Sequence, residues 1–149
     1  KIGVSWIDFK KIKKKSYGLS NDDVSNIIKY GDHTFISLQQ GNVSENLTQV
    51  NQNSSNNIHH IPGINFYDNI DSYASVINNC DLIISIDNFT AHLAGRLGKP
   101  VWLLLDNFSD FRWLENTEDS IWYKNVLLLR QGNENNWAKI INYINTALK

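Results

Sequence analysis

The fold is decided by residues 81–105, which read DLIISIDNFTAHLAGRLGKPVWLLL. Two apolar runs in this stretch predict strands at Asp81–Ile86 and Val101–Leu105, because strands buried on both faces of a parallel sheet are apolar almost throughout. Between them a helix is indicated over Asn88–Leu97, since Gly98 and a proline two residues later are typical of a helix end. A strand, a helix and a second strand in this order predict a parallel β-α-β unit.

The alternation of strands and helices continues through the rest of the chain. Ser20 predicts the N-cap of a helix that ends at Gly31, and residues 42–57 predict a mobile surface excursion with at most a short helix around Glu45–Val50. Residues 106–125 predict an aromatic loop with one helical turn. The other expected elements are strands at Ile2–Ile7, Thr34–Leu38, Ile58–Ile61 and Val126–Leu129, and helices from Asp71 or Ser72 to Asn79 and from Asn133 or Asn135 onward. The sequence therefore predicts an α/β fold, a Rossmann-like doubly wound parallel sheet forming one domain over 1–149.

Composition excludes several classes of protein. The chain has 149 residues with 14 Lys+Arg and 15 Asp+Glu, a net charge of -1, which argues against a general nucleic-acid binder. Its longest apolar runs fall far short of the ~20 residues that span a bilayer, so we expect no transmembrane segment. The single cysteine, Cys80, can form no internal disulfide, which fits a reducing compartment. The chain contains no methionine, which predicts a piece processed or excised from a longer protein.

The most specific candidate site is Asp87–His92, where a predicted buried strand ends and a predicted helix begins. The first turn of a helix binds phosphate well, because its backbone N–H groups are free and its dipole is positive there. If Asn88 caps the helix, the amides of Thr90 and Ala91 point at a ligand, and His92 lies one turn further on the same side as a donor to phosphate. The alternative is that Asp87 or Asn88 only caps the helix and His92 packs against the following loop.

Familiar nucleotide and metal motifs are missing from the sequence. There is no G-x-G-x-x-G and no G-x-x-x-x-G-K-[ST], which argues against a dinucleotide dehydrogenase and a P-loop NTPase. There is also no Asp-x-Asp pair to clamp a metal-bound nucleotide sugar. His59 and His60 are adjacent beside a strand end and would point to opposite faces, so they make a poor metal site. We therefore expect no metal and no cofactor.

Two further segments follow strand ends, where doubly wound sheets bind ligands. Five lysines between residues 10 and 15, Lys13 and Lys15 among them, would neutralise a diphosphate or would form only a solvated face. The five aromatic residues of 106–125 would line a pocket, or would pin a long loop as a small separate core. The candidates for lining a pocket are Trp6, Gln39, Arg112 and Trp113.

Residues 80–105 resemble the C-terminal domain of glycosyltransferase family 9, whose best-known members are the ADP-heptose:lipopolysaccharide heptosyltransferases. The resemblance is closer to a related domain found behind tetratricopeptide repeats in bacterial proteins, with the pattern D-L-V-I-S-V-D-T-A-x-A-H-L-A-G-A-L-G-K-P-V-W-L-L-L. Residues 110–114, 119–123 and 129–131 are similar to that subgroup's D-W-R-W-L, D-S-P-W-Y and L-F-R-Q. Upstream, Val4–Trp6 and Phe35–Gln39 fit its first strands.

The resemblance implies the C-terminal, donor-binding lobe of a two-lobed (GT-B) enzyme that inverts configuration and needs no metal. The acceptor lobe, which supplies the base, would be absent from this chain, so the chain alone is expected to be inactive. Two departures from the family concern the site, because Asn88 stands where the family has Thr or Ser, and Phe89 where the heptosyltransferases have Gly. By position, the residues assigned to the donor diphosphate and sugar are Asp87, Asn88, Phe89, Thr90 and His92, with Lys13 and Lys15.

The resemblance further implies a nucleotide-diphospho-sugar donor and a glycan, lipopolysaccharide or protein acceptor held by the missing N-terminal lobe. It implies a cytoplasmic protein, or one peripheral at the inner membrane. An alternative from another class is a non-catalytic nucleotide-binding or protein-interaction module of the same fold, in which Phe89 fills the former sugar site. A third is a Rossmann-like domain for an unrelated small ligand.

Overall fold

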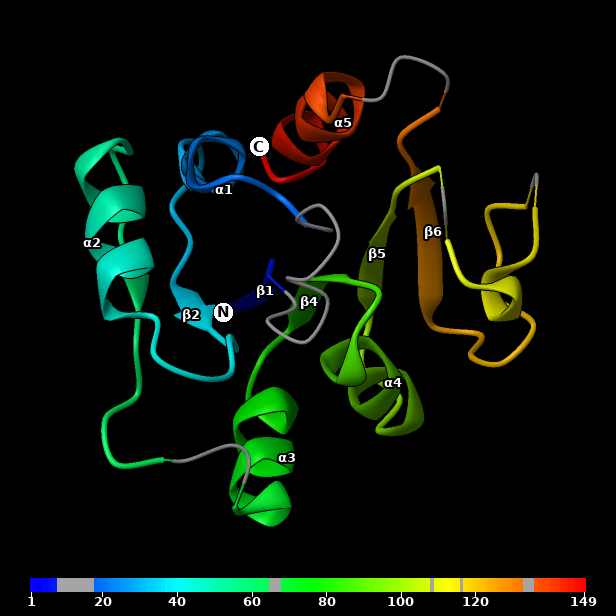
Figure 1. The fold of residues 1–149 in the computed structure, drawn as a ribbon, viewed down its shortest axis with the longest axis horizontal. Helices are drawn as coiled ribbons and strands as arrows, with labels where there is room; N and C mark the ends of the chain where they lie inside the picture. The colour runs from blue at the N-terminus through cyan, green and yellow to red at the C-terminus, as the bar shows by residue number, and fades with distance from the viewer. Residues whose placement is uncertain (8–17, 65–67, 108, 116, 133–135) are drawn as a thin grey trace.

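A computed structural model describes residues 1–7, 18–64, 68–107, 109–115, 117–132 and 136–149 (Figure 1). Within these ranges six parallel strands form one sheet in the order β3-β2-β1-β4-β5-β6. This confirms the predicted Rossmann-like, doubly wound α/β fold, whose strand order reverses between β1 and β4. The strands are β1 (Ile2–Ser5), β2 (Phe35–Ser37), β3 (Ile58–His59), β4 (Leu82–Ile86), β5 (Val101–Leu105) and β6 (Val126–Arg130).

Helices cover both faces of the sheet (Figure 1). On one face lie α1 (Asn21–Ile28), α2 (Ser44–Gln52) and α5 (Ala138–Ala147), and on the other lie α3 (Ile70–Asn78) and α4 (Phe89–Arg96). A 3-10 turn, η2 (Phe111–Trp113), interrupts the aromatic loop, as the sequence predicts. None of the helices in the described ranges is long and apolar enough to cross a membrane.

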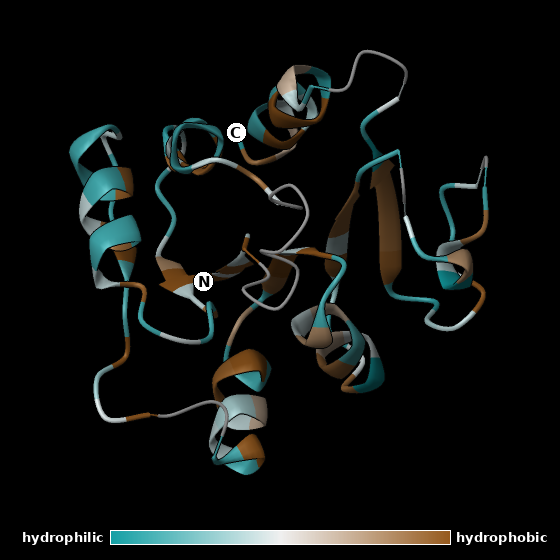
Figure 2. Ribbon diagram, in the orientation of Figure 1, coloured by the Kyte–Doolittle hydropathy of each residue, from teal (hydrophilic) through white to brown (hydrophobic). Residues whose placement is uncertain are grey.

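The neighbouring strands β4 and β5 each contribute side chains to two separate cores. In β4, Ile84 and Ile86 pack with α1 and α5, whereas Ile83 packs with α3 and α4. In β5, Leu104 lies in the core on the side of α1 and α5, and Leu103 lies in the core on the side of α3 and α4. Successive side chains of a strand point to opposite faces, so a strand covered by helices on both sides must be apolar at nearly every position. In Figure 2, β6 is accordingly brown along most of its length, and β5 is brown apart from a paler stretch.

The polar stretch 42–57 contains a slightly longer helix than the sequence predicts. The nine-residue helix α2 buries Leu47 and Val50 against the core on the α1 side. Asn21 on α1 donates to the side chain of Gln49 at 2.6 Å, and Ser25 donates to the carbonyl of Val50 at 3.1 Å. The short helix predicted around Glu45–Val50 is therefore confirmed, since two apolar residues at helical spacing suffice when a neighbouring helix receives them, and the mobility of the stretch stays a prediction.

Several boundaries also differ from their predicted positions. The helix α3 is capped by Asn69, which accepts from the amide of Ser72, rather than by Asp71 or Ser72. The strand β1 ends at Ser5 because the amides of Trp6 and Ile7 bond to the side chain of Gln39 rather than to a neighbouring strand. The predicted caps Ser20 and Asn88 are confirmed. The helix α5 begins at Ala138, later than predicted, and Asn133 and Asn135 lie outside the described residues.

Candidate functional site

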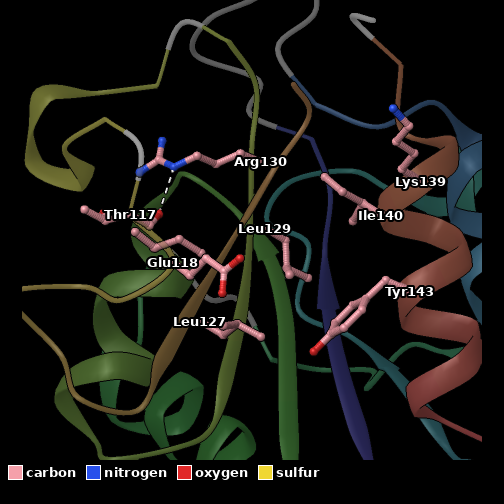
Figure 3. Close-up of a pocket in the computed structure, with 9 residues that line it drawn as sticks. Thr117, Glu118, Leu127, Leu129, Arg130, Lys139, Ile140 and Tyr143 are labelled. Carbon is pink, nitrogen blue, oxygen red and sulfur yellow. Dashed lines mark hydrogen bonds between the residues drawn. The ribbon is translucent and has the colours of Figure 1, made fainter. Parts of the chain in front are cut away.

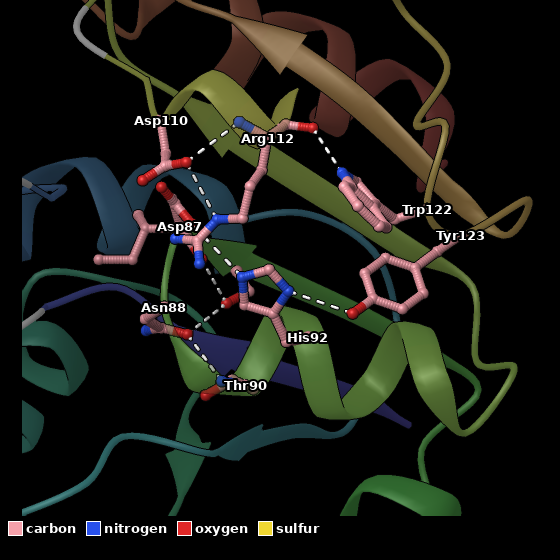
Figure 4. Close-up of polar contacts among 10 residues, drawn as sticks. Asp87, Asn88, Thr90, His92, Asp110, Arg112, Trp122 and Tyr123 are labelled. Carbon is pink, nitrogen blue, oxygen red and sulfur yellow. Dashed lines mark hydrogen bonds and ion pairs between the residues drawn. The ribbon is translucent and has the colours of Figure 1, made fainter. Parts of the chain in front are cut away.

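The helix α4 begins at the carboxyl end of β4, next to the point where the strand order reverses. Two groups of polar side chains lie there. One, called here the inner network, lies largely buried between the sheet and the helices α3 and α4, and comprises Ser5, Tyr73, Ser85, Asn88 and Thr90. The other, called the outer cluster, lies between α4 and the loop that carries η2 and Tyr123. It comprises Asp87, His92, Asp110, Arg112 and Tyr123 (Figure 4).

Asn88 is the centre of the inner network. Its Oδ1 accepts from the amide of Thr90 at 3.0 Å and from the hydroxyl of Ser85 at 3.1 Å, and its Nδ2 donates to Ser5 Oγ at 2.9 Å. The side chain thus caps α4 and also joins β1 to β4. The sequence predicts that the amide of Thr90 points at a phosphate ligand, but in the structure this amide is bonded to the side chain of Asn88.

Thr90 is 1 % exposed and lies deep in the same network. Its hydroxyl is bonded to the hydroxyl of Tyr73 and to Ser5 Oγ, and Tyr73 in turn donates to the carbonyl of Leu38 at 2.9 Å. The network therefore links α3, α4, β1 and the end of β2. Buried hydroxyl and amide groups that are bonded in this way stabilise a fold, because leaving one of them unpaired is costly.

Gln39 and Trp6, predicted to line a pocket, hold the chain after β1. The Oε1 of Gln39 accepts from the amides of Trp6 and Ile7 at 2.9 and 2.8 Å, and its Nε2 donates to the carbonyl of Ile7 at 2.5 Å. Both side chains are buried, Trp6 completely. Ile7 then pairs with Gly18, and Lys13 and Lys15, between those two residues, lie outside the described ones.

His92 occupies the middle of the outer cluster, one turn into α4. Its Nδ1 lies 3.2 Å from the hydroxyl of Tyr123, and its Nε2 lies 4.0 Å from Asp87 Oδ1. The ring stacks on the indole of Trp113, with 5.0 Å between the centroids and 23° between the planes. Beside it, Arg112 Nε pairs with Asp110 Oδ1 at 3.0 Å. Acidic, basic and aromatic groups from three segments of the chain therefore meet at this histidine.

The aromatic loop holds Trp113 and Arg112 in place. Asp110 caps the η2 turn by accepting from the amide of Arg112 at 3.0 Å, and the indole of Trp122 donates to the carbonyl of Arg112 at 2.9 Å. The guanidinium of Arg130 donates to the carbonyls of Trp113 and Thr117. Trp113 is buried against α4, so part of the loop is a small core, whereas Trp122 stays exposed. Trp113 therefore fits the interpretation that the aromatic residues pin this loop, and the interpretation that they line a pocket stays a prediction.

The electrostatics of the outer cluster keep His92 neutral at pH 7. Burial, followed by the nearby positive charge of Arg112, lowers the pKa of His92 below its usual 6.5, against the opposing effect of Asp87 and Asp110. The Nε2 of His92 and the Nε1 of Trp113 are both buried, and neither has a hydrogen-bond partner in the part of the chain that the structure describes. Unpaired buried polar atoms are rare in folded proteins, and each of them calls for an explanation, such as a bound water, an ion or a functional role.

Phe89 lies at the first position of α4. It is 45 % exposed, and its ring stacks on Tyr73 of the inner network with the centroids 6.3 Å apart. The predicted site residues therefore fall into two groups. Asp87, His92, Arg112 and Trp113 come together in or beside the outer cluster, whereas Asn88 and Thr90 belong to the inner network and Phe89 contacts that network through Tyr73.

Two cavities are described, and both lie away from the predicted site. One, of about 530 Å³, opens between β6 and α5, where Leu127 and Leu129 face Ile140 and Tyr143 (Figure 3). The other, of about 350 Å³, lies between α1 and α5. None of the four predicted pocket-lining residues borders either cavity. Among the described residues there is also no cluster of three or more potential metal ligands.

Sequence reasoning missed Tyr123 and Asp110 in the outer cluster and Ser5 and Tyr73 in the inner network. One signal was available, because Gly95 interrupts an otherwise good helix, which often marks a close approach of another group. A Cβ at that position would lie 2.7 Å from Cγ of Tyr123. The partners of Asn88 carried no such signal, since β1 lies about 80 residues away along the chain.

Comparison with known proteins finds a similar segment in protein FlbA of Caulobacter vibrioides. The two are 28% identical over 115 residues, which cover 77% of this chain and 19% of FlbA. The chain thus matches about a fifth of the length of that relative. No family model and no solved structure matches the chain. The resemblance to glycosyltransferase family 9 therefore stays a prediction.

Proposed function

We propose that the chain is the donor-binding lobe of a metal-independent inverting glycosyltransferase and binds a nucleotide-diphospho-sugar at the outer cluster. The observation that carries the proposal is the position of this cluster along the first turns of α4, beside the reversal of strand order. Doubly wound sheets bind ligands at that place. The resemblance of residues 80–105 to the family supports the same class of ligand.

The proposed chemistry follows from the charges of the cluster. Arg112 supplies a permanent positive charge, and neutral His92 supplies a ring N–H, for the oxygens of a diphosphate. Asp87 is an acceptor for a hydroxyl of the ribose or the sugar. Negative charge grows on the nucleotide diphosphate as the glycosidic bond breaks, and fixed donors that meet this charge lower the barrier. The base for the acceptor hydroxyl belongs to a second lobe, so this chain alone transfers no sugar.

Thermal unfolding in a metal-free buffer, with ADP-, UDP- and GDP-sugars at millimolar concentration, tests the proposal. We expect one nucleotide to raise the melting temperature in a saturable way, since a ligand at 100 times its Kd adds about 2.7 kcal/mol to the stability. The variants His92→Ala and Arg112→Ala should lose most of this gain. The matched control is Arg96→Ala, at the far end of the same helix, which should keep it.

A melting temperature that no nucleotide moves would overturn donor binding. A gain that survives in both His92→Ala and Arg112→Ala would keep the nucleotide but place it outside the outer cluster. A gain that requires a divalent ion would contradict the metal-independent class.

A protein-interaction module is the second candidate, and one observation favours it. Large apolar side chains are exposed beside the outer cluster, with Phe111 at 83%, Trp122 at 59% and Phe89 at 45%. The indole of Trp122 is bonded to the η2 turn, so this surface is held in place. Exposed apolar groups that gather on one surface mark interaction sites. If this candidate holds, the nucleotides leave the melting temperature unchanged, and a Phe111→Ser variant binds less of an apolar dye at unchanged stability.

A further inference from the structure

Tyr123 reaches the outer cluster through a gap in the side chains of α4. Gly95, three residues after His92, has no side chain, and a Cβ there would lie 2.7 to 3.1 Å from the ring atoms of Tyr123. The ring therefore packs directly on the helix, and its hydroxyl comes within 3.2 Å of His92 Nδ1. The backbone of Tyr123 is held on both sides, because its amide bonds to Ser120 Oγ and its carbonyl accepts from the amide of Val126.

The opposite ring nitrogen of His92 faces a carboxylate. Its Nε2 lies 4.0 Å from Asp87 Oδ1 and is buried, with no hydrogen-bond partner in the ranges that the structure describes. A neutral imidazole carries one proton, on either nitrogen. If Nδ1 held the proton, the lone pair of Nε2 would point at a negative charge. If Nε2 holds it, a positive N–H edge points there instead, and Nδ1 is free to accept from the hydroxyl of Tyr123.

We propose that Tyr123 is a positioning residue that fixes His92 as the Nε2–H tautomer, with its free donor directed toward Asp87 and the start of α4. Figure 4 shows the ring held between Tyr123 on one side and Asp87 on the other. In this state Nε2 has no lone pair for a metal ion, so the site suits a ligand with acceptor oxygens. That this ligand is a nucleotide diphosphate rests on the proposed function, whereas the tautomer does not.

Protonation would reverse the direction of this bond. The imidazolium has a proton on both nitrogens, so Nδ1 donates and the hydroxyl of Tyr123, which can donate or accept, turns to accept from it. The other charged groups that face the ring are Asp87 at the end of β4, and Asp110 and Arg112 on the loop with η2. Asp87 and Asp110 favour the charged ring, and Arg112 opposes it. The role of Tyr123 is therefore tested on the tautomer of the neutral ring, at a pH above the lowered pKa of His92.

The test is nitrogen NMR of the imidazole rings in the ligand-free chain, with His92→Gln used to identify the signal among the four histidines. We expect His92 to be the Nε2–H tautomer in the unchanged chain. In Tyr123→Phe, which keeps the ring against Gly95, the tautomers should mix. The control is Tyr143→Phe on α5, where the tyrosine ring packs against Trp102 and should leave His92 unchanged.

An Nδ1–H tautomer in the unchanged chain, or a His92 signal that Tyr123→Phe leaves as it was, would overturn the proposal. If Tyr123→Phe fails to fold, Gly95→Ala gives the same test by displacing the ring. If the tautomer depends on Tyr123 but no nucleotide binds, the positioning role stands and the proposed function fails. If a nucleotide binds, His92→Gln should retain more of the affinity than His92→Asn, since only the Gln amide can replace the donor at Nε2.

Discussion

The inner network and the outer cluster lie at the same end of the same helix, yet their polar atoms differ in how fully they are paired. Both polar atoms of Asn88 are bonded within the protein, and the hydroxyl of Thr90 has two partners. In the outer cluster, by contrast, His92 Nε2 and the adjacent Trp113 Nε1 have none among the described residues. The difference teaches that the polar groups at a helix N-terminus can be paired within the protein, while polar atoms one turn further along have no partner among the described residues.

If the inner network is structural, Asn88→Ala should be the most damaging change. It removes a helix cap and also leaves the buried hydroxyls of Ser5 and Ser85 short of a partner, so we expect a loss of about 2–3 kcal/mol in the free energy of unfolding. Asn69→Ala is the matched control, because Asn69 caps α3 at the surface, and it should cost only about 1 kcal/mol. Urea denaturation measures both. Equal losses would show that Asn88 is no more than a cap.

Thr90→Val should have the next largest effect. The change keeps the shape of the side chain but removes its bonds to Tyr73 and Ser5, and we expect a loss of about 1–2 kcal/mol. The control is Thr48→Val on α2, whose hydroxyl bonds only to its own helix at the surface and should change the stability by less than about 0.5 kcal/mol. A nucleotide that stabilises the chain should still bind Thr90→Val, and loss of that binding would place Thr90 in the functional site.

The outer cluster should make the free energy of unfolding depend on pH, with a smaller effect than Thr90→Val. The pKa of His92 is lower in the folded chain than in the unfolded one, so the unfolded state binds the proton more readily. The contribution of His92 to stability is therefore complete above pH 6.5 and is lost as the pH falls toward the lowered value. Denaturation curves at a series of pH values should show this loss in the unchanged chain and not in His92→Gln. A loss of the same size in both would assign it to other groups.

Arg112→Gln should have the smallest effect on stability. Arg112 and Asp110 are both partly exposed, and such ion pairs contribute about 0.2–1 kcal/mol. The same change removes a positive charge beside His92, so the pKa of His92 should rise. NMR titration of the ring measures this, with Arg96→Gln at the other end of α4 as the control. A pKa that stays where it was would remove Arg112 from the electrostatics of the cluster.

The sequence predicts the β4-α4-β5 unit almost residue for residue, because buried parallel strands and a capped helix leave strong local signals. The cap itself, Asn88, is confirmed, and so is the turn at Phe111–Trp113. Helix α2 was not predicted in full, since its burial depends on α1 rather than on its own composition.

The sequence predicts where the candidate site lies, but not that its residues fall into an inner network and an outer cluster. A sequence shows that Asn88 and His92 lie on the same side of a helix, but not which of them meets Ser5 across the sheet. That contact depends on the pairing of Ser5 with Ser85, which are 80 residues apart. Likewise, nothing local indicates that Tyr123 comes back to α4, apart from the missing side chain at Gly95.

The central position of β1 has a consequence for how the protein is made. During synthesis β1 leaves the ribosome before the other strands of this sheet, but Ile2 pairs with Leu82, on β4, and the second half of the sheet is built outward from there. At about 5–20 residues per second, the ribosome needs about 4–16 s to add the intervening residues. Throughout that interval one edge of an apolar strand has no neighbour. The chain is therefore most exposed to aggregation before its second half exists, and we expect its yield to depend on chaperones more than its folded stability suggests.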